Sequence, residues 1–493
     1  MEQGTNVPTS RRGFLSAAGK TAAGAVAAVS APAILGGRTA DAPPNVLFIV
    51  CDQMRGDALS FLGPGNARTP NLDRMARGGV AFENCFSNNP VCVPSRKSWF
   101  SGRYPHQHGS LTNRGKPLLF WAGSLAEHFA GRGYRTGYVG KNHTYEKSAL
   151  EKFATAHIRS REPFRAYSGF VPPWWHGDVY WPEEDCHPRI NTDEALRFLD
   201  ERGREPFFLH VSYFDPHPPY MAPARFTSRY TSAGMELPPY VPPDALSRRL
   251  ADHARAMGFD RMTKADLTET MRYYYAQIEW IDSEVGRLLD GLRRRNLLEG
   301  TVVIFSSDHG DFMGHHRMVR KGMFLYDDLL HVPMIWYAPG RIAAGHRSEA
   351  LAQGIDVFPT LVDLTGGKRP EGLMGRSLRP FLTGEPDADP NHAIFTSAAY
   401  GELSAESLHP SLAPTDGKAK PLHTRVLDQN ISPGFKTSMI RTREWKFILN
   451  ESRPPELYKL DGGCGERENV AGKSEYAGVR RQLERKLQQW WPW

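Results

Sequence analysis

The chain has 493 residues, of which 40% are hydrophobic and 23% are charged, so neither a disordered chain nor a single small domain is expected. The length suits a large α/β domain with a smaller second one. Lysine and arginine outnumber aspartate and glutamate by 61 to 54, a modest basic excess that suits anionic ligands. We find no nucleic-acid-binding motif, and the short basic group Arg293–Arg295 reads as the solvated end of a helix.

Residues 1–42 have the pattern of a targeting segment. Arg11 and Arg12 precede Phe-Leu, a weakly apolar stretch runs from Ala17 to Leu35, and Ala40-Asp41-Ala42 offers a small-residue cleavage site. This order resembles a twin-arginine signal, so we expect the twin-arginine export machinery to carry the folded protein to the periplasm or the outside. A disordered tail with a chance Arg-Arg pair explains the order less well. No other segment approaches the roughly 18 to 20 apolar residues of a membrane span, so no transmembrane anchor is expected.

From Pro44 to about Gly340, short apolar runs alternate with helical patterns, which indicates βαβ units and a parallel sheet. Val46–Val50 is a continuous apolar run, typical of a strand that is buried on both faces. Apolar residues recur at helical spacing from Leu267 to Leu297 and predict one long amphipathic helix. Another buried strand, Thr301–Phe305, follows it.

A cluster of Pro, Asp and Gly near Gly384 predicts a domain boundary, with a main domain over 43–384 and a subdomain over 385–493. In the subdomain, Lys446–Leu449 and Glu456–Leu460 read as antiparallel strands and Leu483–Leu487 as a helix.

Four of the predicted strands are followed by polar residues. Asp52 and Gln53 follow the strand 46–50, Lys141 to His143 follow 135–139, Asp215 and His217 follow 207–213, and Asp308 and His309 follow 302–305. Parallel strands carry their ligands at their carboxyl ends, so these residues should gather at one edge. An Asp after a strand is often only a helix cap, and a lone His is usually a satisfied structural residue. Four such sets at one edge nevertheless indicate a site.

Asp52 and Asp308 would repel each other in a shared cleft unless a cation lies between them. Gln53 and His309 add an amide oxygen and an imidazole nitrogen. An oxygen-rich set suits Ca²⁺ or Mg²⁺, and the single His leaves room for Mn²⁺. Zinc is less favoured, because His and Cys are not the majority.

The five cysteines are Cys51, Cys85, Cys92, Cys186 and Cys464, an odd number without a Cys-x-x-Cys pair. They predict neither a disulfide framework nor a zinc site. Cys92 stands out, because Pro94 suits the first turn of a helix that continues through Phe100. Cys92 would lie just before the helix N-terminus, one turn from Arg96, where the thiol pKa falls. For one residue alone, a small buried Cys would be the preferred interpretation.

Taken together, these motifs are similar to those of formylglycine-dependent sulfatases in the alkaline phosphatase superfamily. Cys92-Val93-Pro94-Ser95-Arg96 matches the C-x-P-S-R signature, and matching segments cover nearly the whole mature chain. They are Pro44–Gln53, Thr69–Ala76, Ser101–Pro105, Gly140–His143, Ser307–Asp311, Gly354–Thr360 and Glu456–Tyr458.

The resemblance implies a large, mostly parallel α/β sheet flanked by helices, plus a smaller C-terminal α+β subdomain with a short antiparallel sheet. It also implies that a formylglycine-generating enzyme oxidises Cys92 and that one divalent ion, Ca²⁺ by preference, binds Asp52, Gln53, Asp308, His309 and residue 92. Arg96 would stabilise the hydrated aldehyde, and Lys141 and Lys321 would hold the sulfate. His143 would handle the proton of the nucleophile, and His217 would donate to the leaving oxygen, with Lys321 assisting.

Two positions depart from many members of this family. Gln53 replaces an Asp and His309 replaces an Asn, as in the branch of choline sulfatases and phosphonate monoester hydrolases. Asn113 falls where that branch places a substrate-contacting Asn, whereas Lys141 and His143 follow the sulfatase pattern. We therefore expect hydrolysis of an aryl, carbohydrate or choline-type sulfate ester. The alternative is phosphonate monoester or phosphodiester hydrolysis on the same scaffold.

A non-catalytic binder of anionic glycans is a third interpretation. It would require an unmodified Cys92 or the loss of another essential group, and the sequence lacks none of them. Trp174, Trp175, Tyr180 and Trp181 crowd one loop and could stack on a sugar or aryl group or face a quaternary ammonium. Packing within the loop or an oligomer contact explains them equally well. The sequence leaves the ester and the oligomeric state open.

Overall fold

The computed structural model describes residues 43–62, 67–113, 123–153, 156–158, 176–179, 181–385, 392–400, 435–460 and 466–493. The chain divides into a unit of residues 1–39 and a unit of residues 40–493, and all described residues belong to the second. The predicted export signal, residues 1–42, therefore lies outside the described residues.

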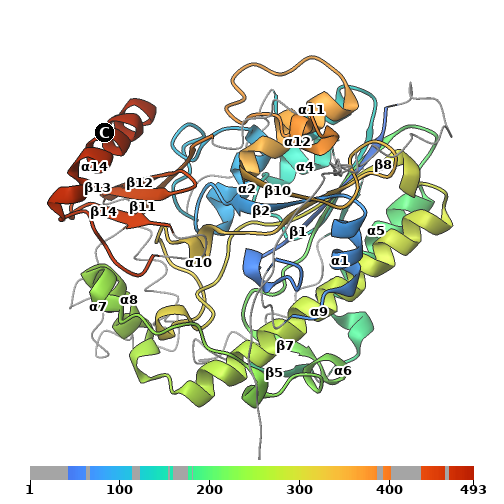
Figure 1. The fold of residues 1–493 in the computed structure, drawn as a ribbon. Coiled ribbons are helices and arrows are strands. Elements are labelled where there is room, and N and C mark those ends of the chain that lie inside the picture. The colour runs from blue at the N-terminus through green and yellow to red at the C-terminus, as the bar shows by residue number, and fades with distance from the viewer. Residues whose placement is uncertain are drawn as a thin grey trace, which may run out of the picture. The chain divides into compact units, whose positions relative to one another are not determined.

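An eight-stranded sheet forms the centre of this unit (Figure 1). Its strands lie in the order β10 (His346–Gln353), β2 (Val80–Phe86), β9 (Met334–Tyr337), β8 (Thr301–Ser307), β1 (Asn45–Cys51), β6 (Phe207–Ser212), β3 (Arg135–Gly140) and β4 (Ala156–Ile158). Within it, β9 pairs antiparallel with both β2 and β8, and the other pairings are parallel. The predicted mostly parallel sheet is confirmed.

Helices cover both faces of the sheet, which explains why β1 is apolar from Val46 to Cys51. Leu47 and Ile49 of β1 pack in one core cluster, which includes residues of α1 (Pro70–Arg77), α5 (His187–Asp200), α8 (Arg248–Met257) and α9 (Lys264–Arg294). Phe48 and Val50 face the other cluster, with α2 (Cys92–Ser101), α3 (Leu125–Ala130), α4 (Lys147–Phe153), α11 (Val357–Thr365) and α12 (Arg379–Thr383). Alternate side chains of a strand point to opposite faces, so a doubly covered strand needs apolar residues throughout.

The predicted long helix is α9, which spans 31 residues and begins with a capping box. The hydroxyl of Thr263 accepts a hydrogen bond from the N–H of Asp266, and the Asp266 carboxylate accepts one from the N–H of Thr263. Three short helices and two short strands lie in the connections: α6 (Ala224–Thr227), α7 (Pro243–Leu246), α10 (Asp327–Leu330), and the parallel pair β5 (His176–Val179) and β7 (Tyr220–Pro223).

The C-terminal part forms a second, four-stranded antiparallel sheet, drawn in orange to red in Figure 1. Its strands are β11 (Ile394–Tyr400), β12 (Phe435–Arg441), β13 (Trp445–Asn450) and β14 (Glu456–Lys459), and α14 (Ala477–Trp490) packs against β12 and β13. The sheet begins beyond Gly384, but residues 40–493 belong to one compact unit, so the boundary at Gly384 stays a prediction. Trp490 packs against Tyr104, His106 and Phe395, which accounts for part of the aromatic C-terminus.

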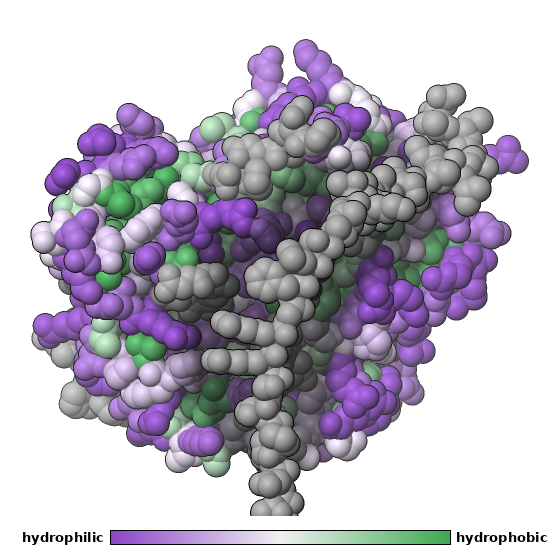
Figure 2. All heavy atoms as spheres, in the orientation of Figure 1, coloured by the Kyte–Doolittle hydropathy of each residue, from purple (hydrophilic) through white to green (hydrophobic). Residues whose placement is uncertain are grey.

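Buried charges join the C-terminal sheet to α10. Lys446 on β13 is fully buried, and its ammonium lies 2.7 Å from Asp327 Oδ1 and 2.6 Å from Glu466 Oε1. Figure 2 shows a largely hydrophilic face with smaller hydrophobic groups between the polar side chains. Among the described residues, no helix is long and apolar enough to cross a membrane.

Candidate active site

The acids that follow β1 and β8 meet the thiol of Cys92 at one edge of the sheet. Ligand atoms of Asp52, Cys92, Asp308 and His309 all lie within 4.8 Å of one another, and all four residues are buried. β1 and β8 are adjacent parallel strands with Cys51 opposite Ser307, so the residues after them emerge side by side. The structure thus brings together the groups that the sequence analysis assigned to one site.

Cys92 is the first residue of α2, and Pro94 is the third, so the helix begins one residue earlier than the sequence suggested. All ten residues of α2 are buried. The helix N–H of Val93 donates to Asn113 Oδ1 at 3.0 Å. Asn113, predicted to contact substrate, thus caps the helix that carries Cys92, and its carbonyl oxygen is already engaged.

Arg96 contacts residues at the carboxyl ends of three strands, β1, β6 and β8. Its Nε lies 2.7 Å from Asp308 Oδ2, and one terminal nitrogen lies 3.1 Å from Asp52 Oδ2. The other terminal nitrogen donates to Ser212 Oγ at the end of β6, 2.6 Å away. The guanidinium therefore separates the two acids, a task that its rigid fork of donors suits better than a lysine would. Ser95 of the same turn donates to the backbone carbonyl of Asp308 at 2.6 Å.

Two lysines complete the charge around the thiol. The Lys141 ammonium contacts Asp52 Oδ2 and lies 3.7 Å from Cys92 Sγ. The Lys321 ammonium lies 3.0 Å from Cys92 Sγ and 2.9 Å from Gln53 Oε1. Both lysines that were predicted to bind sulfate thus contact residue 92. Lys141 directly follows β3, and Lys321 lies in the segment between β8 and α10.

The charges set the protonation of Cys92. Burial and the charge of Asp52 raise the pKa of the thiol, whereas Lys141, Lys321 and His309 lower it, and the net pKa lies well below the usual range. Three fixed positive charges, on Arg96, Lys141 and Lys321, therefore face two carboxylates and an acidic thiol. A neutral group at position 92 would leave this cluster with an excess of positive charge, which favours a bound anion.

The two carboxylates differ in their titration. Burial raises the pKa of Asp52, but Lys141, Lys321, His217 and Arg96 together hold it well below its usual range. For Asp308, burial and the charge of Asp52 outweigh Arg96 and raise the pKa to about 6. The two lysines therefore stabilise the ionised form of Asp52 more than that of Asp308.

Gln53 is held with its amide oxygen toward the site. Its backbone has φ 74°, in the left-handed region that a side chain other than that of glycine rarely occupies, and its N–H donates to Asp308 Oδ1 at 3.0 Å. Its Nε2 donates to Asp311 Oδ2 at 2.6 Å, and the Tyr220 hydroxyl donates to the same oxygen at 2.8 Å. Because Asp311 takes the amide nitrogen, Gln53 Oε1 turns toward Lys321.

These donors fit a hard divalent cation. His309 Nδ1 faces the Gly310 carbonyl at 2.9 Å, which leaves Nε2 directed at Cys92 Sγ, 3.2 Å away. With Asp52, Asp308 and Gln53, the set has three residues that donate oxygen and one that donates nitrogen, the composition for which Ca²⁺, Mg²⁺ or Mn²⁺ was predicted. The fit is one of donor chemistry, because the lysine ammoniums contact Asp52, Gln53 and His309 here.

The two remaining histidines of the predicted site, His143 and His217, are less buried than His309. His143 is exposed and interacts with the Cys92 side chain, while its crowded surroundings and Lys141 lower its pKa. His217 is half-buried, and its pKa is lowered well below the usual range by burial and by Lys321 and Lys141, against Asp52. Its Nδ1 faces the Pro218 carbonyl at 2.7 Å, so Nε2 is the nitrogen left for a ligand.

Among the aromatic residues proposed for substrate contact, Trp181 lines a recess beside His217. Trp174, Trp175 and Tyr180 lie outside the described residues, as does Cys464. Sequence reasoning missed the roles of Ser212, Asp311 and Gln277, which act through contacts with residues far away in the chain. Asp311 follows Asp308 and His309 in the sequence, and that proximity was the one available signal.

Comparisons with known proteins agree with this geometry. A family model described as Sulfatase matches residues 44–367. The chain is 29% identical over 459 residues to an arylsulfatase of Clostridium perfringens, covering 85% of this chain and 95% of that protein. It is 26% identical to the multifunctional alkaline phosphatase superfamily protein PehA of Trinickia caryophylli, with 90% and 95% covered. Among solved structures, a phosphonate monoester hydrolase from Silicibacter pomeroyi superposes with a TM-score of 0.72 at 26% identity, with 90% and 94% covered.

Proposed function

Because the chain belongs to the sulfatase family, whose members hydrolyse sulfate esters, we propose that it does so through residue 92, oxidised from cysteine to formylglycine. One observation carries the proposal. The Cys92 side chain lies at the N-terminus of a buried helix, within 3.7 Å of Asp52, His309, Lys141 and Lys321. That arrangement would direct a nucleophile at a sulfur atom whose oxygens face positive charge.

The aldehyde would supply, as its hydrate, an oxygen nucleophile and a second hydroxyl whose deprotonation releases sulfate afterwards. Oxidation also removes the negative charge of the thiolate, so the cluster of Arg96, Lys141 and Lys321 gains room for the sulfate anion. His143 lies where it can take a proton from the hydrate. Water is consumed overall, and the products are an alcohol and inorganic sulfate.

We propose that Asp52, Gln53, Asp308 and His309, together with residue 92, hold one divalent cation, with Ca²⁺ favoured by the oxygen donors. Such an ion supplies charge that stabilises the sulfate oxygens as the ester bond breaks. Lys141 and Lys321 would then turn from the carboxylate toward the sulfate. Arg96 would remain between Asp52 and Asp308 and fix the spacing of the two acids.

His217 is the proposed proton donor to the leaving oxygen. In the free enzyme its imidazole is neutral, because burial and Lys321 lower its pKa. A bound sulfate ester brings negative charge beside it and raises that pKa, so Nε2 can carry a proton when the ester is bound.

We expect His217→Ala to lower kcat/KM for an alkyl sulfate by about 10²- to 10⁴-fold. An activated aryl sulfate such as 4-nitrophenyl sulfate should lose much less, since its leaving group departs without a proton. Steady-state kinetics on both esters measure the difference, and His346→Ala, an exposed histidine on β10, is the control. Equal losses on the two esters would show that His217 does not protonate the leaving group.

Phosphonate monoester hydrolysis is the second candidate, favoured by Gln53 and His309 and by the likeness to the Silicibacter pomeroyi enzyme. Measuring kcat/KM side by side on an aryl sulfate and an aryl phosphonate monoester decides between them. We expect the sulfate to be preferred, because Lys141 and His143 both reach residue 92. A preference for the phosphonate would reverse the assignment.

We propose export by the twin-arginine route, on the pattern of residues 1–42. The Cys92 side chain is 1% exposed, so its oxidation should precede folding and hence also export. Changing Arg11 and Arg12 to lysine should keep active enzyme inside the cell, as fractionated activity assays would show, whereas Arg38→Lys should not. Unchanged export of the double variant would exclude this route.

A further inference from the structure

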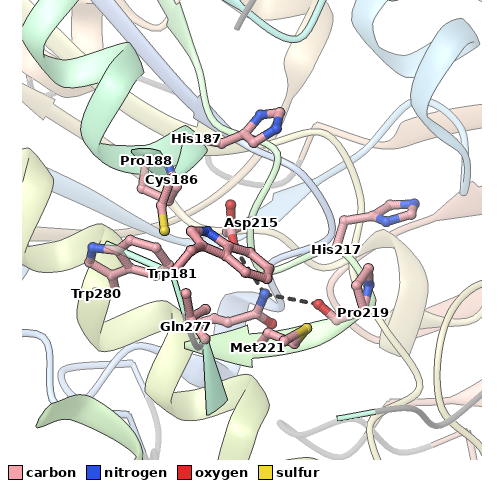
Figure 3. A pocket seen from close by; sticks show the side chains of 11 residues that line it. Trp181, Cys186, His187, Pro188, Asp215, His217, Pro219, Met221, Gln277 and Trp280 are labelled. Carbon is pink, nitrogen blue, oxygen red and sulfur yellow. Dashed lines mark hydrogen bonds between the residues drawn. The ribbon is translucent and has the colours of Figure 1, made fainter. Parts of the chain in front are cut away.

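A small recess opens beside His217. It lies between β7, the start of α5 and α9, and has a volume of about 40 Å³. Figure 3 shows its lining side chains, with Trp181, Asp215 and Gln277 converging at the centre and His217 at one side. Trp181, Met221 and Trp280 supply apolar walls.

His217 connects the recess to the reacting centre. It lines the recess, and its charge environment includes Asp52, Lys141, Lys321 and Cys92. An ester whose sulfate lies on the two lysines would therefore extend its alcohol portion past His217. The recess shares His217 with that exit, which makes it a place for the first atoms of the leaving group.

Two polar side chains in the recess, those of Gln277 and Asp215, offer hydrogen-bond acceptors. Gln277 is 1% exposed, and its Nε2 donates to Asp215 Oδ1 at 2.9 Å and to the Pro219 carbonyl at 3.2 Å. Both hydrogens of the amide are thus used, whereas Oε1 has no hydrogen-bond partner among the described residues. A buried carbonyl oxygen without a donor is costly, and a ligand that donates to it removes that cost.

Asp215 adds a negative charge that no described basic side chain compensates. It is 9% exposed and forms no ion pair within the described residues, in contrast to Asp52 and Asp308, which pair with Arg96. Its Oδ1 already accepts the hydrogen bond from Gln277. A cation in the recess would be held by this carboxylate.

We propose that this recess selects the leaving group of the sulfate ester and favours a compact one that carries a protonated amine. The inference rests on the proposed function and names the substrate class of that site. A protonated amine gives Gln277 Oε1 a donor and Asp215 a counter-charge, and its short hydrocarbon arm contacts Trp181, Met221 and Trp280. The volume holds about three waters, and so a group of about aminoethyl size.

The test compares four alkyl sulfates with one aryl reference. The alkyl esters are 2-aminoethyl sulfate, its neutral isostere propyl sulfate, 2-hydroxyethyl sulfate and choline sulfate. We expect kcat/KM for 2-aminoethyl sulfate to exceed that for propyl sulfate about tenfold or more, chiefly through KM. Similar values for these two would overturn the proposal. If kcat/KM for 2-hydroxyethyl sulfate equals that for the amine, the positive charge is irrelevant. If choline sulfate has the highest kcat/KM, the hydrogen-bond donor is irrelevant, because its quaternary ammonium has no N–H.

Variants locate the preference. In Asp215→Asn the ratio of the amine to propyl sulfate should fall to within about threefold of one, because the amide keeps the shape without the charge. Gln277→Leu should weaken both the amine and the hydroxyethyl ester relative to propyl sulfate. Asp185→Asn, an exposed acid just before α5, should keep the wild-type ratio and the wild-type rates. A ratio that survives in Asp215→Asn would contradict the assignment.

The aryl reference separates this inference from the proposed function. If the wild-type enzyme hydrolyses 4-nitrophenyl sulfate but shows no preference among the alkyl esters, only the recess assignment fails. If no sulfate ester is hydrolysed by protein with oxidised residue 92, the proposed function fails, and the recess assignment fails with it.

Discussion

Replacement of Cys92 by alanine is expected to reduce kcat/KM for sulfate esters by about four orders of magnitude or more. The reason is positional as well as chemical. Residue 92 starts α2, and its side chain contacts Lys141, Lys321, Asp52 and His309 together. Without it, a bound sulfate ester still meets the positive cluster, but nothing on the protein attacks sulfur. KM should therefore change far less than kcat.

A second cysteine serves as the matched control. Cys85 on β2 is also fully buried, and its sulfur lies 3.9 Å from Met334 Sδ in the core. Cys85→Ala should cost about 1 kcal/mol of stability or slightly more and leave kcat unchanged. Urea unfolding and steady-state kinetics on both variants separate the two effects. Residual kcat within about tenfold of wild type in Cys92→Ala would show that the nucleophile is another group.

The second large effect is expected for Asp52→Asn, which should lower kcat/KM by about 10³-fold or more and abolish high-affinity binding of Ca²⁺. Asp52 is the acid that Arg96, Lys141 and Lys321 all approach, at 3.1 Å for Arg96 and 3.7 Å for Lys321. An amide at this position offers neither the charge nor the second oxygen that a divalent cation needs. When a chelator has removed the metal ion from this variant, the positive side chains of Arg96, Lys141 and Lys321 would have Asp308 as their one remaining carboxylate in the site. The free energy of unfolding should therefore also fall, by about 3 to 5 kcal/mol.

Calorimetric titration with Ca²⁺ and thermal unfolding with and without chelator measure these losses separately from activity. Asp57→Asn is the control, because Asp57 pairs with Arg55 at 2.5 Å and, in the described structure, forms no ion pair or hydrogen bond with any of the five residues proposed to bind the cation. It should bind Ca²⁺ as the wild type does. An Asp52→Asn variant that still gains stability from Ca²⁺ would place the cation elsewhere.

The sequence predicted the sheet and the long helix well, because both depend on local patterns. Consecutive residues of β1 from Val46 to Cys51 are apolar, because helices cover both faces of that strand. The helix α9 has 31 residues with an amphipathic pattern and begins with a capping box. The sequence analysis placed Trp174, Trp175, Tyr180 and Trp181 in one loop and did not predict β5, which lies between them in the chain. β5 pairs with β7, some 44 residues later in the chain, and such a pairing leaves no local signal.

For the site, the residue types after each strand were sufficient to place Asp52, Asp308 and His309 together. The protonation of these residues could not be predicted, because it depends on which long basic side chains contact the two acids in the folded chain. The role of Arg96 toward the hydrated aldehyde stays a prediction, and the structure adds that its fork lies between the two acids. The pairing of Gln277 with Asp215 joins the middle of α9 to the end of β6, and only the folded chain reveals it.

The most direct measurement is mass spectrometry of the peptide that contains residue 92, taken from protein that hydrolyses a sulfate ester at constant specific activity through purification. We expect the mass of an aldehyde or its hydrate at this position, in a fraction that rises and falls with specific activity across preparations. An intact thiol at residue 92 in fully active protein would contradict the proposed chemistry.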